Sequence, residues 1–426
     1  MWVRIPVGNS HVIVGDAIEK DAIMRSTNAD DEDDATEASL DEEFATSSEE
    51  KRFVEREVAQ IREFVSSLSV NDLKGGDWFA KLLQYSLHQY VTEVDAAYFK
   101  EKYPNLPPDA IVDARINMAA NYAAIEGALC SSAYTAAIAA TIGSGGGASP
   151  LTLPAGGASF AVDLSYTSFL QLRMTHDISV LYGVPLDLSD PDDTWKLVKL
   201  AFGIKAGEAA GEAALKGLPA FIRPAVKKIF SGATLTALKS LPVVGKYLLQ
   251  RNIIKFAIPG ITIPVTTAVN RWMTQAAGSR AKSLLRREAQ IIEASQRIVA
   301  QAENVEALLA SLWWIISADK AVQDEERLLL HYLSVSAEQF ADIGEEYQQY
   351  IETFKCQIEG DEEDLWARIS QISEEGAPNL YRAAVIASAV DGKISDQELQ
   401  RLKLLANYLG LKHDENLINE IKRQWK

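Results

Sequence analysis

The sequence predicts an all-α, mostly helical protein, and three observations support this class. Apart from residues 1–8, which read as a short β segment, stretches with the alternation of a strand are hard to find. A Leu-rich helical stretch occurs twice, each time after the same acidic turn. Small residues also recur at four-residue spacing along one apolar stretch, a pattern that lets another helix approach closely. These small residues are Ala119, Ala123, Gly127 and Ser131.

Length and composition indicate two or three domains in 426 residues. We expect an N-terminal segment over 1–52, a central helical domain over 53–300 and a C-terminal helical domain over 301–426. The two cysteines, Cys130 and Cys356, lie far apart and lack metal-ligand spacing, which is typical of a reducing cytoplasm. No secretory signal is expected, because the first residues lack an apolar core of signal length.

The net charge of −17 is unevenly distributed. Residues 26–50 contain eleven carboxylates and no base, so this tract is predicted to be disordered. One interpretation is a solubilising linker. The other is an internal competitor that docks on a basic face elsewhere in the chain.

Such a basic face is predicted within residues 196–287, which carry sixteen bases opposed only by Glu208 and Glu212. Apolar stretches separate these bases, a pattern that suits an anionic membrane surface. Nucleic acid is not expected as a partner, since aromatic stacking residues are sparse and no recognised nucleic-acid motif occurs. The candidate lipid-binding residues are Lys205, Lys216, Arg223, Lys227, Lys228, Lys239, Lys246, Arg251, Lys255 and Arg271.

Residues 127–162 contain no charged side chain. A helix entered near Asp113 continues to Ile142, and the glycine-rich residues 143–150 then break it. An apolar helix of about 18 or more uninterrupted residues would be needed to span a bilayer. We therefore expect either a buried core helix or a membrane-inserting hairpin, and not a stable transmembrane segment.

The stretch from Asp163 to Gly183 reads as one helix with Gly183 as its C-cap. Arg173 and Asp177 are four residues apart, so they share a face and can pair. Together with Glu126 and Asp163 they are charges on otherwise apolar helices. They form either a buried polar network or the lining of a ligand groove.

The order of these features resembles the EcsC family over about residues 55–300. The resemblance rests on Ala-Ala-Ile-Glu126-Gly127-Ala, the glycine-rich sequence, Asp163, Leu-Arg173 and Leu-Tyr182-Gly183-Val. It implies a membrane-associated protein without an established activity; the family takes its name from a gene beside an ABC-transporter pair.

A second resemblance rests on an internal repeat, in which residues 319–326 and 391–398 share the pattern D-x-x-[V/I]-x-D-x-E. One interpretation is a capped helix–turn–helix used twice, with Asp396 as N-cap and Glu398 in the first helical turn. The other is a divalent-cation site formed by carboxylates from both turns. An EF-hand is excluded, because Ala387 and Ala389 would occupy two of its ligand positions.

The repeat resembles the TerB-like (tellurite-resistance) domain over about residues 303–426. The resemblance implies an all-helical domain in which acidic residues of both copies are proposed to bind a metal, here a divalent cation of the calcium or magnesium class. Lys320 departs from it, since the second copy has Gly392 there. The implied ligands are Asp319, Asp324, Glu326, Asp391, Asp396 and Glu398.

Catalysis finds little support, because neither a P-loop nor a G-x-S-x-G elbow is present. We expect a non-enzymatic cytoplasmic protein, peripheral at the inner face of a membrane, that binds anionic lipids. The C-terminal domain would sense or dock, with a role in envelope stress or in regulating a membrane transporter. The alternatives are a soluble scaffold for protein partners and a metal-dependent hydrolase that uses the repeated carboxylates.

Overall fold

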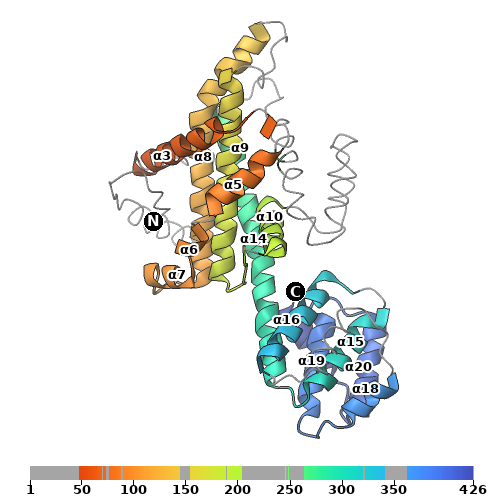
Figure 1. Cartoon of the computed structure of the whole chain (residues 1–426). Coiled ribbons are helices and arrows are strands. Elements are labelled where there is room, and N and C mark those ends of the chain that lie inside the picture. The colour runs from red at the N-terminus through yellow and green to blue at the C-terminus, as the bar shows by residue number, and fades with distance from the viewer. Residues whose placement is uncertain are drawn as a thin grey trace, which may run out of the picture. The chain divides into compact units, whose positions relative to one another are not determined.

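The structure is a computed structural model, and every regular element that it describes is a helix (Figure 1). No strand occurs among the described residues, which confirms the all-α prediction. The β segment expected at residues 1–8 lies outside them. The described residues are 48–69, 71–72, 76–87, 90–143, 154–188, 190–203, 245, 248, 263–319, 322–340 and 362–425.

Only the last three residues of the acidic tract, 48–50, are described. They form the first turn of α3 (Ser48–Ser66), in which Glu50 is buried. The prediction of disorder was therefore wrong for these three residues. Carboxylates are favoured in the first turn of a helix, where they face the positive end of its dipole.

The chain divides into two compact units, residues 1–285 and 286–426. This division lies earlier than the boundary expected at residue 300. The reason is that the C-terminal part of α14 (Ile263–Ala300) contributes Ile291, Ala294 and Ile298 to the core of the second unit.

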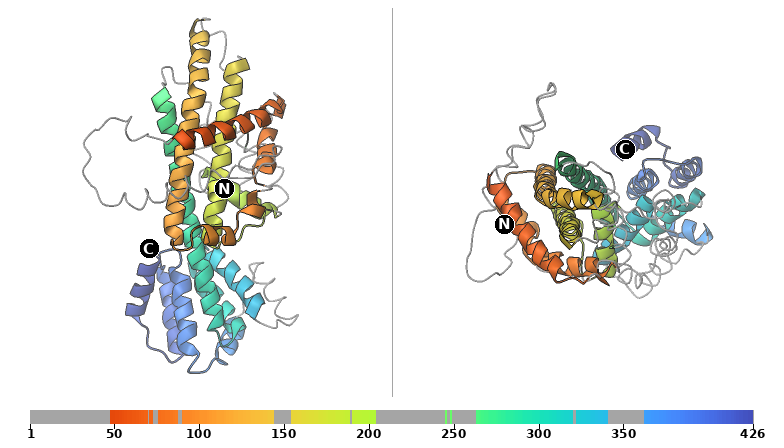
Figure 2. Two further views of the ribbon diagram at one scale, coloured as in Figure 1. Left: turned by 90° about the vertical axis from the view of Figure 1, so that its left-hand side faces the viewer. Right: turned by 90° about the horizontal axis from the view of Figure 1, so that it is seen from above.

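The first unit is built around two long helices, α8 (Pro108–Gly143) and α9 (Pro154–Leu181), which lie side by side (Figures 1 and 2). Helix α9 begins before the Asp163 start that we expected. It also packs against several shorter helices. These are α3, α5 (Asp77–Leu87), α7 (Ala96–Lys102) and α10 (Pro191–Phe202), and the four-residue α6 (Tyr90–Glu93) follows α5.

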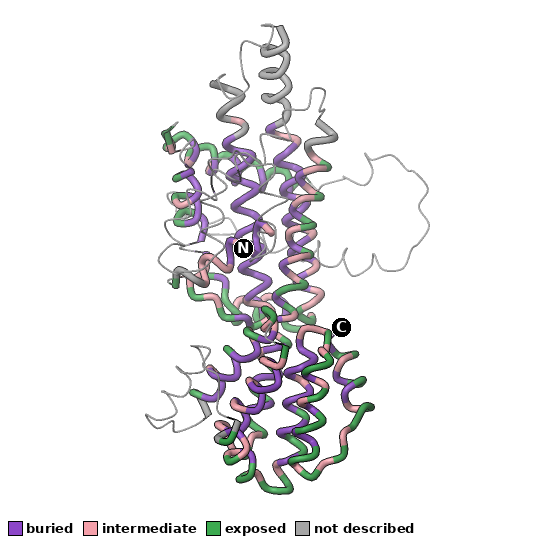
Figure 3. Tube along the Cα trace, turned by 90° about the vertical axis from the view of Figure 1, so that its right-hand side faces the viewer, coloured by how far each residue is buried: buried purple, intermediate pink, exposed green. Residues whose placement is uncertain are grey.

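Burial extends around most of α9 and much of α8 (Figure 3). A helix surrounded by protein lacks the polar stripe of an amphipathic helix, and the described part of α9 is buried in this way on all sides. Helix α9 ends as predicted at Gly183, which has a φ of 65°. The Val184 N–H donates to the Ser179 carbonyl at 2.9 Å, as in a Schellman C-cap.

Helix α14 approaches both long helices closely at Gly278. A Cβ atom added there would lie 2.8 Å from Ile116 Cγ1 and from Met174 Sδ. Asn270, two turns earlier, bonds to Asp163, and Lys282, one turn later, pairs with Asp113 at 2.5 Å. These pairings show that α14 runs parallel to α9 and antiparallel to α8.

The second unit contains two helix–turn–helix pairs, as the repeat predicted. The first pair is α15 (Val305–Ile316) and α16 (Asp324–Phe340), with the short 3-10 helix η2 (Ser317–Asp319) after α15. The second pair is α19 (Ala377–Ala389) and α20 (Asp396–Tyr408). Helices α18 (Glu362–Ile369) and α21 (Glu415–Gln424) complete the unit.

Within the part of the chain that is described, no helix combines the length and the apolarity that crossing a membrane requires.

The close approach at Gly278 leads to a testable prediction. Gly278→Val should destabilise the protein by about 2 kcal/mol, because the added methyl groups must displace Ile116 and Met174. Ala276→Val, on the exposed face of the same helix, should cost only about 0.5 kcal/mol through helix propensity. Urea unfolding of both variants measures the difference. Equal effects would contradict the packing of α14 in the first unit.

Candidate functional site

The repeated turns place one glutamate each in equivalent, buried positions. The Gln323 N–H donates to Glu326 Oε2, and the Ser395 N–H donates to Glu398 Oε2, both at 2.7 Å. Both side chains are buried. Each glutamate side chain therefore accepts a hydrogen bond from the backbone N–H of the residue before its own helix. The glutamate has the same helix-capping role in both copies.

The N-cap of α20 is Ser395 and not Asp396, which corrects our prediction. Ser395 Oγ accepts a hydrogen bond from the Glu398 N–H at 3.2 Å and completes a reciprocal capping box. Asp396 is the first helical residue. In the turn before it, Gly392 has a φ of 83°, a conformation that favours glycine. The corresponding Lys320 lies outside the described residues.

Four of the six predicted cation ligands influence one another electrostatically. Burial raises the pKa of Glu326 to about 8, and the charges of Glu398, Asp391 and Asp319 add to this effect. Burial also raises the pKa of Glu398, with further contributions from Asp319 and Asp391.

The repeat therefore brings these carboxyl groups of both copies into one acidic cluster, which we define as Asp319, Glu326, Asp391 and Glu398. The other two predicted ligands, Asp324 and Asp396, are exposed and do not contribute to these shifts. No group of three or more Asp, Glu, His or Cys side chains among the described residues is arranged to hold a metal ion.

Two arginines that sequence reasoning did not select hold the repeated turns. Arg287 donates to the Val390 carbonyl at 2.5 Å and to the Trp425 carbonyl at 2.6 Å. Arg401 donates to the Trp314 carbonyl and, at 3.2 Å, to Ser317 Oγ. Arg287 was counted within the basic region, but it braces the second unit. Its partners are more than a hundred residues away, so no local pattern could have identified it.

The second unit also has a pocket of about 550 Å³. Its lining mixes both charge signs, including Glu293, Arg297, Glu303 and Arg382. Such a lining offers polar contacts without selecting for an anion or a cation.

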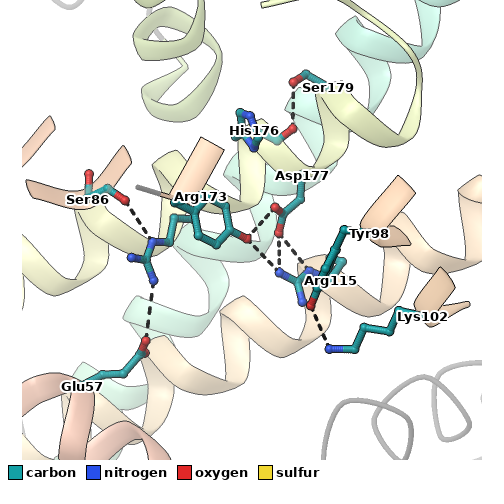
Figure 4. A network of polar contacts seen from close by, with 10 residues as sticks. Glu57, Ser86, Tyr98, Lys102, Arg115, Arg173, His176, Asp177 and Ser179 are labelled. Atoms are coloured by element: carbon teal, nitrogen blue, oxygen red, sulfur yellow. Dashed lines mark hydrogen bonds and ion pairs between the residues drawn. The ribbon is translucent and has the colours of Figure 1, made fainter. Parts of the chain in front are cut away.

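In the first unit, a buried ion pair joins α8 to α9 (Figure 4). Arg115 donates through Nε, at 2.9 Å, and through Nη2, at 2.5 Å, to Asp177 Oδ2. The Tyr90 hydroxyl donates to Asp177 Oδ1 at 2.6 Å. Both oxygens of this buried carboxylate thus receive hydrogen bonds, which compensates its loss of solvent.

Arg173 has other partners than the Asp177 that its spacing suggested. Its Nη1 lies 3.8 Å from Glu57 Oε1, and its Nε donates to the Ser86 carbonyl at 3.2 Å (Figure 4). Its guanidinium also lies 3.7 Å from the centre of the Phe169 ring. Burial raises the pKa of Glu57 to about 6, against the opposing influence of Arg173 and of the Tyr166 hydroxyl.

Glu126 and Asp163 form a separate cluster with a residue of α14. The Asn270 Nδ2 atom lies 2.7 Å from Asp163 Oδ1 and 3.4 Å from Glu126 Oε2. All three side chains are at most 1% exposed. The four charges predicted as one polar network or groove are thus buried, and they divide between two clusters, because the Arg173 guanidinium also lies 4.6 Å from the centre of the Tyr90 ring and so joins the Asp177 group.

Of the ten candidate lipid-binding bases, only Arg271 belongs to the described residues. Its neighbour Trp272 is 69% exposed. Farther along α14, two other bases make contacts inside the first unit: Arg280 donates to the Gly203 carbonyl at 3.1 Å, and Lys282 pairs with Asp113. These two bases are at least partly engaged within the protein.

No protein-family model, curated protein or solved structure matches the chain. The resemblances to the EcsC family and to the TerB-like domain stay predictions from the sequence.

The buried Glu57 predicts a specific pH dependence of stability. Its pKa in the folded state, about 6, exceeds the ordinary 4.5, so the folded protein binds this proton more tightly than the unfolded chain. The stabilisation of the folded state by this tighter proton binding at Glu57 is fully present below pH 4.5, and it is lost as the pH rises through 6. The free energy of unfolding of the wild type, relative to Glu57→Gln, should therefore fall by about 2 kcal/mol between pH 4 and 7.

Urea unfolding at a series of pH values measures this difference. Glu63→Gln, on the exposed side of the same helix, serves as the matched control. Its free energy of unfolding should fall with pH as much as that of the wild type. A wild-type curve parallel to that of Glu57→Gln would contradict the prediction.

Proposed function

We propose that this protein is a non-enzymatic peripheral membrane protein that binds anionic lipid surfaces through its basic region, residues 196–287. The C-terminal unit then acts as an acidic sensing or docking module. The membrane face concerned is the cytoplasmic one, and the role is in envelope stress or in the regulation of a membrane transporter.

The exposure of the Trp272 side chain is the observation that supports this proposal. Trp272 lies on the exposed face of α14 and is 69% exposed, more than any other large apolar side chain among the described residues, and it stands beside Arg271 in the sequence. Indole rings favour the boundary between lipid headgroups and acyl chains, and arginine favours anionic headgroups. The two neighbours together match the chemistry of an anionic membrane surface.

The ends of α8 and α9 add support. Residues 127–143 and 154–162 are helical and contain no charged side chain. This part of the hairpin has no charge to desolvate when it meets an apolar phase. It suits contact with the acyl chains of a lipid surface.

The proposal predicts the behaviour of a Trp272→Ala variant with liposomes. Binding to vesicles of anionic phospholipid should weaken by at least about tenfold, since burying a large apolar side chain contributes on the order of 1.5–3 kcal/mol. Co-sedimentation at low and high salt measures this. Arg271→Gln should weaken binding at low salt more than at high salt, because salt screens the headgroup attraction.

Leu404→Ala provides the matched control, as Leu404 is an exposed apolar residue of the second unit, at 54% exposure. It should bind like the wild type. If the full-length protein is indifferent to both anionic and neutral vesicles, the membrane function is wrong and a soluble scaffold for protein partners takes its place.

A second candidate function is binding of a calcium- or magnesium-class cation at the acidic cluster. It is favoured by one observation: the two turns bury Glu326 and Glu398 in equivalent positions, where carboxylates of both copies raise their pKa values. A divalent cation would relieve the repulsion between these negative charges and suits their oxygen ligands.

This candidate predicts that Asp319→Asn combined with Asp391→Asn weakens calcium or magnesium binding by at least about tenfold, since charge count sets such affinities. Isothermal titration of the full-length protein measures this. Asp324→Asn, in the exposed first turn of α16, should bind like the wild type. A loss that is equal in both variants would argue against the acidic cluster as the site.

A further inference from the structure

Glu126 on α8 and Asp163 on α9 are two carboxyl groups that are almost fully buried within the first unit. Both lie within hydrogen-bond distance of a single nitrogen, Asn270 Nδ2 on α14. Three helices thus direct polar side chains to one point.

The register of the helices extends this cluster by one turn. Helices α9 and α14 run parallel, with Asp163 beside Asn270. Four residues later on each helix stand Thr167 and Thr274, so each lies one turn beyond Asp163 or Asn270 on the same face of its helix. Both threonines are buried. The two hydroxyls thus add buried oxygen atoms one helical turn beyond the contact between Asp163 and Asn270.

Several of these oxygens have no hydrogen-bond donor within the described part of the chain. They are Asp163 Oδ2, Asn270 Oδ1, Thr167 Oγ1 and Thr274 Oγ1. Buried polar atoms are normally satisfied, and an orphaned buried acceptor costs on the order of 1–3 kcal/mol. A concentration of such atoms at one place therefore indicates a ligand that the protein itself does not supply.

The charge at this place points to a cation. Two carboxylates that share one amide nitrogen repel each other, and Asn270 contributes only the dipole of its amide. The nearby Cys130 stays a neutral thiol, because burial, the charges of Glu126 and Asp163 and a hydrogen bond to Glu126 raise its pKa, against the opposing charge of Arg62. A proton would satisfy one oxygen only, whereas a cation coordinates several at once.

We propose that Glu126, Asp163, Asn270 and Thr274 form a binding site for a hard divalent cation inside the first unit, with Thr167 as a further oxygen donor. The two carboxylates balance the double positive charge. Exchange of the amide nitrogen and oxygen of Asn270, by rotation of its side chain, turns Oδ1 toward the cation. The all-oxygen set favours calcium or magnesium over softer metals.

The experiment compares the full-length wild type with the double variant Glu126→Gln, Asp163→Asn, which keeps the shape of both side chains. Each protein is dialysed against EDTA and then against calcium, magnesium or potassium chloride. In the wild type we expect about one divalent ion per chain at this site and a higher melting temperature, because a ligand of the folded state stabilises it. In the double variant the affinity should fall by at least about tenfold, as charge count sets calcium affinity.

Matched variants separate this site from the acidic cluster of the second unit. Asp319→Asn with Asp391→Asn should leave the binding assigned here intact, so the failure of either proposal is recognisable. Thr274→Val should weaken binding while Thr274→Ser retains it, which tests the site even if the double variant does not fold.

Two results would overturn the proposal. One is an equal stabilisation of the wild type and the double variant by divalent ions. The other is indifference of the wild type to these ions, combined with stabilisation on acidification that the double variant lacks, which would make the pair a proton site.

Discussion

The first unit depends on one constraint: a charge buried between its helices needs a partner. The ion pair between Arg115 and Asp177 is an example. Helices α8 and α9 are surrounded by protein along much of their length, so any charge on them enters the interior and needs a partner. Arg115, Tyr90 and Asp177 meet that need with three mutually bonded side chains. The arrangement fixes α8, α9 and the short α6 in one register, because a shift of one turn would leave a buried charge uncompensated.

The cluster around Asn270 obeys the same constraint in a different way. Here two carboxyl groups meet an amide, and acceptor oxygens are left over, although the helices and their packing are the same. The contrast separates a polar network that completes the fold from a group of side chains that is complete only with a ligand. Gly278 makes the contacts of α14 in this region possible, since its missing side chain lets α14 lie against both α8 and α9.

The second unit reaches its organisation through repetition. Each turn ends in a glutamate that caps the following helix, and burial of both glutamates makes the pair of turns one electrostatic unit. Arg287, which precedes the repeat, and Arg401, on α20 of its second copy, then bond to backbone carbonyls next to the two turns. The acidic cluster is therefore a property of the assembled pair and not of either copy.

The sequence by itself determined the all-α class, the helix–turn–helix repeat and the helix end at Gly183. These follow from periodicity, capping and glycine conformation, which act between residues within a few positions of one another. Only the tertiary structure decided which charges meet. Arg173 pairs with Glu57 and not with Asp177, and Asp163 meets an asparagine 107 residues later, which no pattern had marked. Such pairings depend on which faces of distant helices are buried together, and local spacing does not encode that.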